Sequence, residues 1–223
     1  MSKKRKKRNR RYEGGASGAS AQLTPRPAEE RLPARAQAVS TQVSTLRRFA
    51  AYAIDWAAGG VVTGVPAVLL YSAVTRRTDF YSDLYVFEAL GHSMWWGVLA
   101  GVLCVLAGLF YYVWVPARIT PGQTLGKRLL GLEIRAMDGS LPTLGALAVR
   151  YGVIGFLLEG NAFVTGRFIR ELVTLITRID VATPWSIACV GITIVSAFLA
   201  LYRPQHRAIH DFAAGTRVVA RIS

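Results

Sequence analysis

The sequence predicts an all-α transmembrane protein: a helical bundle of four spans, with three as the alternative, a small cytoplasmic β element and a surface amphipathic helix. Three apolar runs carry this prediction. Phe49 to Thr75 is 27 residues with one charge, Ser93 to Ala117 is 25 residues with none, and Thr183 to Tyr202 is 20 residues with none. A helix rises about 1.5 Å per residue and the hydrocarbon core is about 30 Å thick, so roughly 20 apolar residues suffice to cross.

The amino-terminal segment differs in composition from the rest of the chain. Residues 1–45 are basic and rich in Gly, Pro, Ser and Ala, which predicts a disordered cytoplasmic tail before a membrane domain over 46–223. Residues 1–48 contain 13 Lys/Arg and 3 acidic residues, so this segment holds +10 of the formal net charge of +14. Beside a membrane span such a tail indicates a cytoplasmic anchor that binds anionic lipid headgroups, and no nucleic-acid partner is expected.

The apolar segments place the spans at about 46–74, 93–115, 148–166 and 184–202. The third segment is either a short span or a helix that lies partly in the interface, because residues 151–166 cover only about 24 Å as a helix and include Glu159. The next stretch is amphipathic, with apolar residues at helical spacing, and is expected to lie on the membrane surface. Its apolar face is formed by Phe168, Leu172, Leu175 and Ile179.

A small sheet is predicted from two β-rich segments. Residues 131–143 alternate in polarity and contain Asp138-Gly139, a strong turn signal. We expect Leu132–Met137 to pair with Arg217–Arg221, which requires both segments on one side of the membrane. The tail, the 118–145 loop and the C-terminal segment are all basic, so the positive-inside rule places all three in the cytoplasm of a plasma-membrane protein and requires an even number of spans.

The first span contains a charged residue, Asp55. A charged side chain within a span costs about 2.5–3.5 kcal/mol on insertion scales, so it is seldom incidental. Arg48 lies two turns earlier on the same face, but about 10.5 Å away along the axis, which is too far for an ion pair. Asp55 therefore needs a partner such as Arg150, a water-filled cavity, or its own proton. It is either an ion- or proton-exchanging site or a hydrogen-bonded anchor between helices, and Glu159 is the second candidate.

Other chemistry has weaker support in the sequence. His206 and His210 have a helical metal spacing, with Asp211 adjacent, but no third ligand converges on them, so no metal or other cofactor is predicted. No nucleophile elbow, dinucleotide-binding or phosphate-binding motif is present in the sequence, and the protein is not expected to be an enzyme. Glycines at positions 97, 101 and 108 would let another helix approach the second span closely.

Three ordered motifs resemble those of the RDD family of bacterial membrane proteins. They are RRFAAYAID at 47–55, TPGQTLGKRLLGLEI at 120–134 and HDFAAGTRVV at 210–219. The family is named for an arginine and two aspartates, and the resemblance implies that these are Arg48, Asp55 and Asp211, with Arg47 as the alternative arginine. The resemblance gives stronger grounds for expecting the fold and the site residues than for expecting a particular activity. Further candidate site residues are Gly126, Lys127, Arg150, Glu159, His210, Gly215 and Thr216.

Two functions are consistent with these features. One is a small transporter or cation/proton antiporter, as associated with some members of the family, in which Asp55 exchanges the ion, Arg48 tunes it and Asp211 organises a cytoplasmic mouth. The alternative is a non-transporting scaffold or accessory subunit that binds a protein partner or anionic lipid through its basic tail and cytoplasmic loops. For either function, the expected partners are membrane lipids and either further copies of this chain, as a homo-oligomer, or another membrane protein.

Overall fold

The computed structural model describes residues 43–160, 163–202 and 207–221. The predicted disordered tail, apart from residues 43–45, lies outside these ranges. The described elements, in chain order, are α2 (Thr45–Thr75), α3 (Val86–Ala89), α4 (Met94–Leu109) continued by the π-helix η2 (Phe110–Ile119), α5 (Leu125–Leu129), β1 (Leu132–Ala136), α6 (Leu144–Leu147) continued by the π-helix η3 (Ala148–Leu158), α7 (Val164–Thr177), α8 (Ala182–Tyr202), α9 (Ile209–Ala213) and β2 (Thr216–Ala220).

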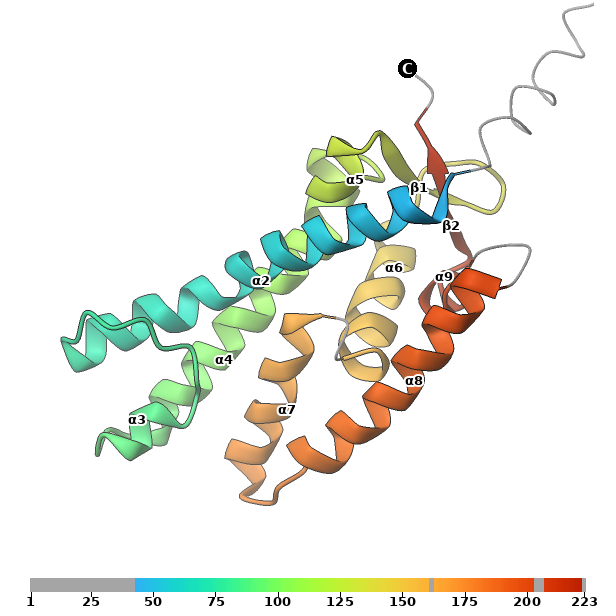
Figure 1. Cartoon of the computed structure of the whole chain (residues 1–223). Helices are drawn as coiled ribbons and strands as arrows, with labels where there is room; N and C mark the ends of the chain where they lie inside the picture. Colours follow the sequence, from blue (N-terminus) through green and yellow to red (C-terminus); the bar gives the residue numbers. More distant parts are fainter. Residues whose placement is uncertain (1–42, 161–162, 203–206, 222–223) are drawn as a thin grey trace, which may run out of the picture.

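The bundle has two distinct ends. The sheet, α5 and α9 lie together at one end, which we call the sheet end, and α3 and the turn between α7 and α8 lie at the other (Figure 1). Helices α2 and α4 run beside each other along the length of the molecule. The chain thus leaves the sheet end in α2, returns in α4 and η2, leaves again through α6 and α7, and returns in α8.

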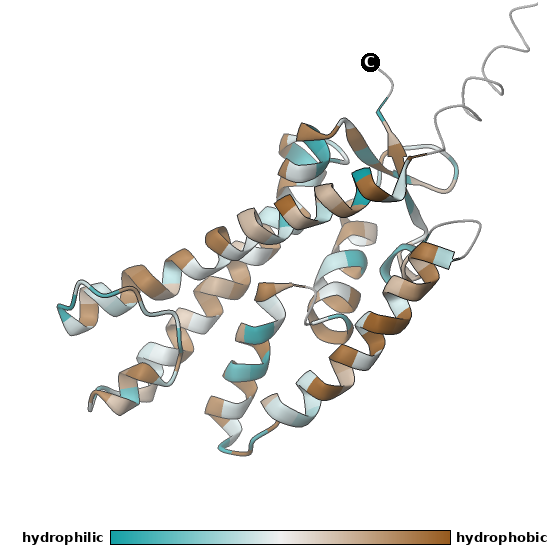
Figure 2. Cartoon of the chain, in the orientation of Figure 1, coloured by the Kyte–Doolittle hydropathy of each residue, from teal (hydrophilic) through white to brown (hydrophobic). Residues whose placement is uncertain are grey.

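Within the described ranges, three helices are long and apolar enough to cross a membrane: Thr45–Thr75, Met94–Ile119 and Ala182–Tyr202. Their outward faces are apolar, as the brown ribbon of α8 shows (Figure 2), and Leu69 and Ile194 are each 64% exposed. In water these faces would form an unusually large exposed hydrophobic patch. In a bilayer, lipid chains would cover them. The second helix extends beyond the predicted end at residue 115, because Pro116 is accommodated within η2.

The predicted helix over 148–166 differs in the structure. The helix of α6 and η3 ends at Leu158, where the Glu159 amide donates to the Ile154 carbonyl over 2.8 Å. A new helix, α7, begins at Val164. Gly166 explains the close approach between these two helices, because a Cβ at this position would lie 2.5 Å from the Gly160 carbonyl oxygen. The segment is therefore two shorter helices arranged one beyond the other (Figure 1).

Helix α7 was expected on the membrane surface, but it packs inside the bundle against α4. Phe168 and Leu175 are 1% exposed. The predicted glycine stripe on the second span allows this contact, since a Cβ at Gly101 would lie 2.6 Å from Leu172 and one at Gly108 would lie 2.3 Å from Thr165. The amphipathic pattern was identified correctly, but Phe168 and Leu175 of its apolar face are covered by other parts of the protein.

The predicted sheet is confirmed. Strands β1 and β2 pair antiparallel, with Leu132 opposite Ala220 and Ala136 opposite Thr216. The inward residues Leu132 and Ile134 are 0% exposed. The Asp138-Gly139 turn follows β1, with Gly139 at a φ of 88°, a conformation that favours glycine. The sheet therefore joins the middle of the chain to its C-terminal segment at one end of the bundle.

Candidate functional site

Asp55 lies at the centre of a buried polar cluster. Its side chain is held on α2, a third of the way along the helix, and the residue is 3% exposed. One carboxylate oxygen accepts hydrogen bonds from the Gly126 amide at 2.7 Å and the Tyr111 hydroxyl at 3.3 Å. The other accepts from the Thr124 hydroxyl at 2.5 Å and the Lys127 ammonium at 2.8 Å. We call these five residues the Asp55 cluster.

The segment 124–127 supplies most of the donors to Asp55 because it forms the first turn of a short helix. Thr124 stands at the N-cap of α5, so the first free amides of the helix point toward the carboxylate. Close contact with α2 requires glycine at 126, since a Cβ there would lie 2.2 Å from the Ala51 carbonyl oxygen. Burial disfavours the charged ammonium of Lys127, but the negative charge of Asp55, its hydrogen bond to Lys127 and the nearby Tyr151 together outweigh burial and raise the pKa of Lys127.

Asp211 forms a second buried cluster at the sheet end. Arg150, on η3, pairs with one Asp211 carboxylate oxygen and donates to the Thr216 hydroxyl at 2.7 Å. The other carboxylate oxygen accepts from the Ala208 amide at 3.2 Å. Arg207 donates to the Asp211 backbone carbonyl at 2.7 Å. These residues are the Asp211 cluster, and Arg150 and Asp211 are 2% and 4% exposed.

A third contact involves Glu159, at the break before α7. Glu159 is 2% exposed. One of its carboxylate oxygens accepts from the Ser196 hydroxyl of α8, and the other lies 2.6 Å from Nδ1 of His210. The Ser196 oxygen in turn accepts from the Ile209 amide at 3.0 Å. Glu159 therefore joins the break, α8 and α9.

The structure separates two of the three residues that were predicted to form one constellation: Asp55 and Asp211 bind different cations, whereas Arg48 lies within electrostatic reach of Asp211. Asp55 pairs with Lys127 and not with Arg150, which pairs with Asp211. Arg48 donates to the Val218 carbonyl of β2 at 2.9 Å. The two aspartates thus belong to two clusters, each with its own cation. Aromatic side chains lie between them, and the rings of Tyr112 and Tyr151 are 5.3 Å apart.

The remaining predicted residues are positioned as follows. Arg47 donates to the carbonyls of Leu130, at 2.6 Å, and Gly131, at 3.4 Å. Gly215 has a φ of 61° and ends α9 before β2. His206 lies outside the described residues, and within them no group of three or more His, Cys, Asp or Glu could hold a metal ion. His210 contacts Glu159 instead.

Sequence reasoning overlooked Tyr111, Thr124 and Ser196, which hydrogen-bond to the buried carboxylates. Thr124 could have been found, because it lies in the quoted 120–134 motif directly before a short helix, where threonine is a common N-cap. Tyr111 and Ser196 carry no such signal. They lie in apolar spans, and only the tertiary fold brings them to a carboxylate.

The fold and the site define a helical membrane protein in which buried aspartates are neutralised by cations from distant parts of the chain. A family model described as the RDD family matches residues 43–215. The chain therefore belongs to the RDD family, as the three motifs predicted. No curated protein and no solved structure matches the chain.

Proposed function

We propose that this protein is a non-enzymatic membrane scaffold that presents a rigid module to a partner at one face of the plasma membrane. The module consists of α5, β1, α9 and β2 at the sheet end. The proposal rests on one observation: the buried aspartates of the family motif are bound by cations and hydroxyls that connect this module to the membrane helices. Asp55 of α2 is bound by the 124–127 segment, and Asp211 of the module is bound by Arg150 of η3.

Arginines at the start of α2 make a third connection to the module. Arg47 binds the carbonyl of Leu130 at the end of α5, and Arg48 binds that of Val218 in β2. Arg47 is exposed and Arg48 is half-buried, so solvent screens these hydrogen bonds and each is worth less than the roughly 1.5–3 kcal/mol typical of bonds to charged groups. Three connections at separate points restrict rocking of the module relative to the helices. A fixed surface of this kind suits docking, in which a preformed shape lowers the entropic cost of binding.

Ion exchange at Asp55 is the second candidate, and the Lys127 contact is the observation in its favour. An incoming cation or proton could displace the ammonium from the carboxylate, which would then be the exchanging group. The cost is high, because Asp55 already accepts four hydrogen bonds and Lys127 is 9% exposed. Removing either partner of a buried ion pair leaves an uncompensated charge. We therefore favour the scaffold.

The membrane topology belongs to the same proposal. The helices α6–η3 and α7 together make the third of four crossings, and both termini are cytoplasmic. The pairing of β1 with β2 supports this, because both strands must lie on one side. The basic tail supports the orientation. Interrupted helices are tolerated at membrane depth where protein surrounds the freed backbone groups, and the break is flanked here by α4 and α8.

Cysteine labelling tests the topology. We expect Ser140→Cys, between β1 and α6, and Asp180→Cys, between α7 and α8, to react with a membrane-impermeant maleimide from opposite faces of the membrane. Arg77→Cys, after α2, should share the face of Asp180→Cys. The unmodified protein is the background control, since Cys104 and Cys189 are buried. Labelling of Ser140→Cys and Asp180→Cys from the same face would contradict four crossings.

Two assays on the full chain distinguish scaffold from exchanger. We expect affinity-purified protein in mild detergent to retain a partner, or a second copy, at fixed stoichiometry. We expect proteoliposomes to show no sodium- or potassium-dependent proton flux above empty vesicles. The charge-neutral double variant Asp55→Asn/Lys127→Gln should keep the partner. Flux in the native protein that this double variant abolishes would instead establish exchange at Asp55.

A further inference from the structure

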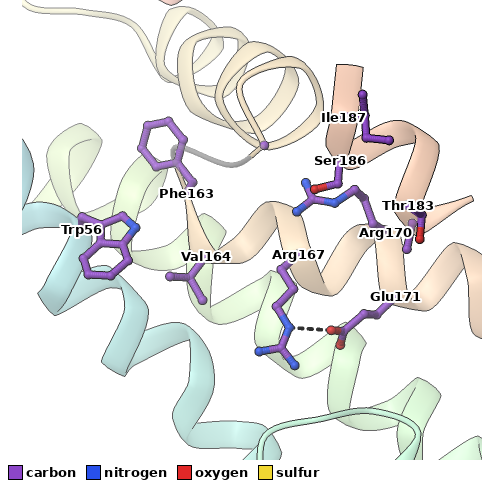
Figure 3. A pocket seen from close by; sticks show the side chains of 11 residues that line it. Trp56, Phe163, Val164, Arg167, Arg170, Glu171, Thr183, Ser186 and Ile187 are labelled. Carbon is purple, nitrogen blue, oxygen red and sulfur yellow. Dashed lines mark hydrogen bonds and ion pairs between the residues drawn. The ribbon is translucent and has the colours of Figure 1, made fainter. Parts of the chain in front are cut away.

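Basic side chains at the two ends of the bundle have different partners. Away from the sheet, in the cavity between α2, α7 and α8, Arg167 pairs with Glu171 over 2.5 Å (Figure 3). Arg178, after α7, pairs with Glu88 over 2.8 Å. At the sheet end, by contrast, three neighbouring arginines form no ion pair with any described residue: Arg47, Arg128 and Arg221. We call these three residues the arginine group.

The arginine group meets at Gly131, in the turn between α5 and β1. Arg47 reaches this turn from α2, where its guanidinium donates to the Leu130 carbonyl at 2.6 Å and to the Gly131 carbonyl at 3.4 Å. The Gly131 carbonyl also accepts from the Arg221 amide at 2.9 Å, and the Gly131 amide donates to the Arg128 carbonyl at 3.2 Å. One turn thus brings together arginines from α2, from α5 and from the end of β2.

The described part of the chain offers only neutral acceptors to the arginine group. Arg47 is bound by backbone carbonyls, and the Arg221 guanidinium donates to the side-chain oxygen of Gln123 at 3.3 Å. The Arg128 side chain makes no hydrogen bond or ion pair within the described ranges. All three arginines are exposed. Because a guanidinium has five N–H donors, each arginine keeps donors and a full positive charge for an external anion.

Helix α5, which carries Arg128, lies beside the apolar part of α2. A Cβ at Gly126 would lie 2.2 Å from the Ala51 carbonyl oxygen, and the Gly126 amide donates to Asp55 at 2.7 Å. Ala51 and Asp55 both belong to the apolar run that begins at Phe49. Helix α5 therefore lies at the level where α2 enters the hydrocarbon, and an outward side chain at this level faces lipid.

The outward face of α5 is apolar on both sides of Arg128. Leu125, Arg128 and Leu129 share this face, because residues three and four apart lie on one side of a helix. Leu125 is 45% exposed and Leu129 is 64% exposed. Leu46, beside Arg47 at the start of α2, is 77% exposed. Apolar side chains next to exposed cations suit the boundary between acyl chains and anionic headgroups.

We propose that the arginine group and the outward face of α5 form a binding site for one anionic membrane lipid in the leaflet at the sheet end. The phosphate of the lipid lies against the three guanidinium groups, whose planar N–H donors suit phosphate oxygens. An acyl chain packs on Leu125 and Leu129. An acidic protein segment would match the arginines but not two leucines at the level of the hydrocarbon. The site belongs to the folded bundle and is independent of the scaffold function.

Photocrosslinking of the full-length protein in phosphatidylcholine vesicles tests the site. The probe is a trace of phosphatidylglycerol with a diazirine in its acyl chain, and mass spectrometry of peptides locates the crosslinks. The yield on α5 is divided by the yield on α8, a lipid-facing helix that contains no basic residue. We expect this ratio to be about tenfold higher than with a phosphatidylcholine probe of the same chain, since only the anionic head binds the arginines.

Single substitutions locate the binding. Arg128→Gln should lower the crosslinking ratio about tenfold, whereas Arg118→Gln should leave it unchanged. Arg118 is the matched control because it is an exposed arginine at the same end that lies over the Trp114 ring. In mild detergent, with bound lipid counted by native mass spectrometry, Leu129→Ala should weaken phosphatidylglycerol binding about threefold. Leu69→Ala, at an equally exposed leucine of α2, should not.

Four results would overturn the proposal. Equal ratios with the two probes would mean that α5 faces lipid without selecting an anion. Equal losses in Arg118→Gln and Arg128→Gln would indicate general attraction by a basic end. Displacement of the lipid by an equal concentration of inorganic phosphate would make the occupant a soluble anion. Loss of a copurified protein in Arg128→Gln, with unchanged crosslinking, would make this face a protein docking site.

Discussion

Lys127→Met is expected to lower the free energy of unfolding by about 3–5 kcal/mol, because it leaves the Asp55 carboxylate buried beside hydroxyls and an amide but without its cation. The Asp55–Lys127 distance is 2.8 Å, and the two residues are 3% and 9% exposed. The measurement is equilibrium unfolding in detergent micelles. Arg128→Met is the matched control: Arg128 follows directly on the same helix and is exposed, so its loss should cost no more than about 0.5 kcal/mol.

A double-mutant cycle separates the ion pair from the packing of each side chain. Asp55→Asn alone leaves a buried ammonium, whereas Asp55→Asn/Lys127→Met removes both charges. We expect the double variant to be more stable than the sum of the single effects predicts, by about 1–3 kcal/mol. Additive effects would mean that Asp55 and Lys127 are not coupled, and Asp55 would then be joined to the module only through its contacts with Thr124 and Gly126.

The parts of this fold that depend on local sequence pattern could be predicted. The long apolar runs placed α2, α4 and α8, because a membrane requires about 20 apolar residues whatever their partners are. The β-rich alternation before Asp138-Gly139 placed β1, and the requirement that β1 and β2 meet constrained the topology. The glycines at 97, 101 and 108 correctly marked a close helix contact, although not its partner, α7.

The predictions that failed depend on tertiary choices. Asp55 had several cations available, and neither composition nor spacing distinguishes Lys127 from Arg150, which lie 72 and 95 positions further along the chain. The break after Leu158 falls on Glu159 and Gly160, and it was missed because the residues on both sides of these two are mostly apolar. Its signals, Gly160 and Gly166, are common in membrane helices and became informative only when Gly166 was seen against the Gly160 carbonyl.

The family motif acquires a physical meaning from this arrangement. Asp55, in the first motif, accepts bonds from residues 124–127 of the second motif. Asp211 accepts from Arg150, which lies outside the three motifs, and from Thr216 of its own motif. Of the two candidate arginines, Arg48 binds the Val218 carbonyl of β2 and Arg47 binds the Leu130 carbonyl. The three motifs, far apart in the sequence, thus supply contacts on both sides of the junction between the membrane helices and the module. Such a junction requires the buried aspartates and the arginine even if the protein transports no ion.

Asp211→Asn should have the second large effect, and its dependence on pH identifies the cause. Burial alone would raise the pKa of the Asp211 carboxyl, but the positive charges of Arg150 and His210 outweigh burial and hold that pKa below its usual value. A carboxyl with a lowered folded-state pKa stabilises the fold above its unfolded pKa of about 3.9, and the stabilisation is lost as pH falls through the folded value. At pH 7 the variant should lose about 3–5 kcal/mol, since Arg150 becomes an uncompensated buried charge.

Measuring the effect of Asp211→Asn on the free energy of unfolding at several pH values tests the ion pair. The difference in unfolding free energy between native protein and Asp211→Asn should be largest near pH 7. It should shrink as the pH is lowered below about 3.9, where the carboxyl of the unfolded chain takes up its proton, and should level off below the lower pKa of the native carboxyl. Asp138→Asn is the control, because Asp138 lies in an exposed turn. A difference that is the same at pH 7 and at pH 3 would mean that Asp211 acts through shape and neutral hydrogen bonds, so that its charge does not hold the module to η3.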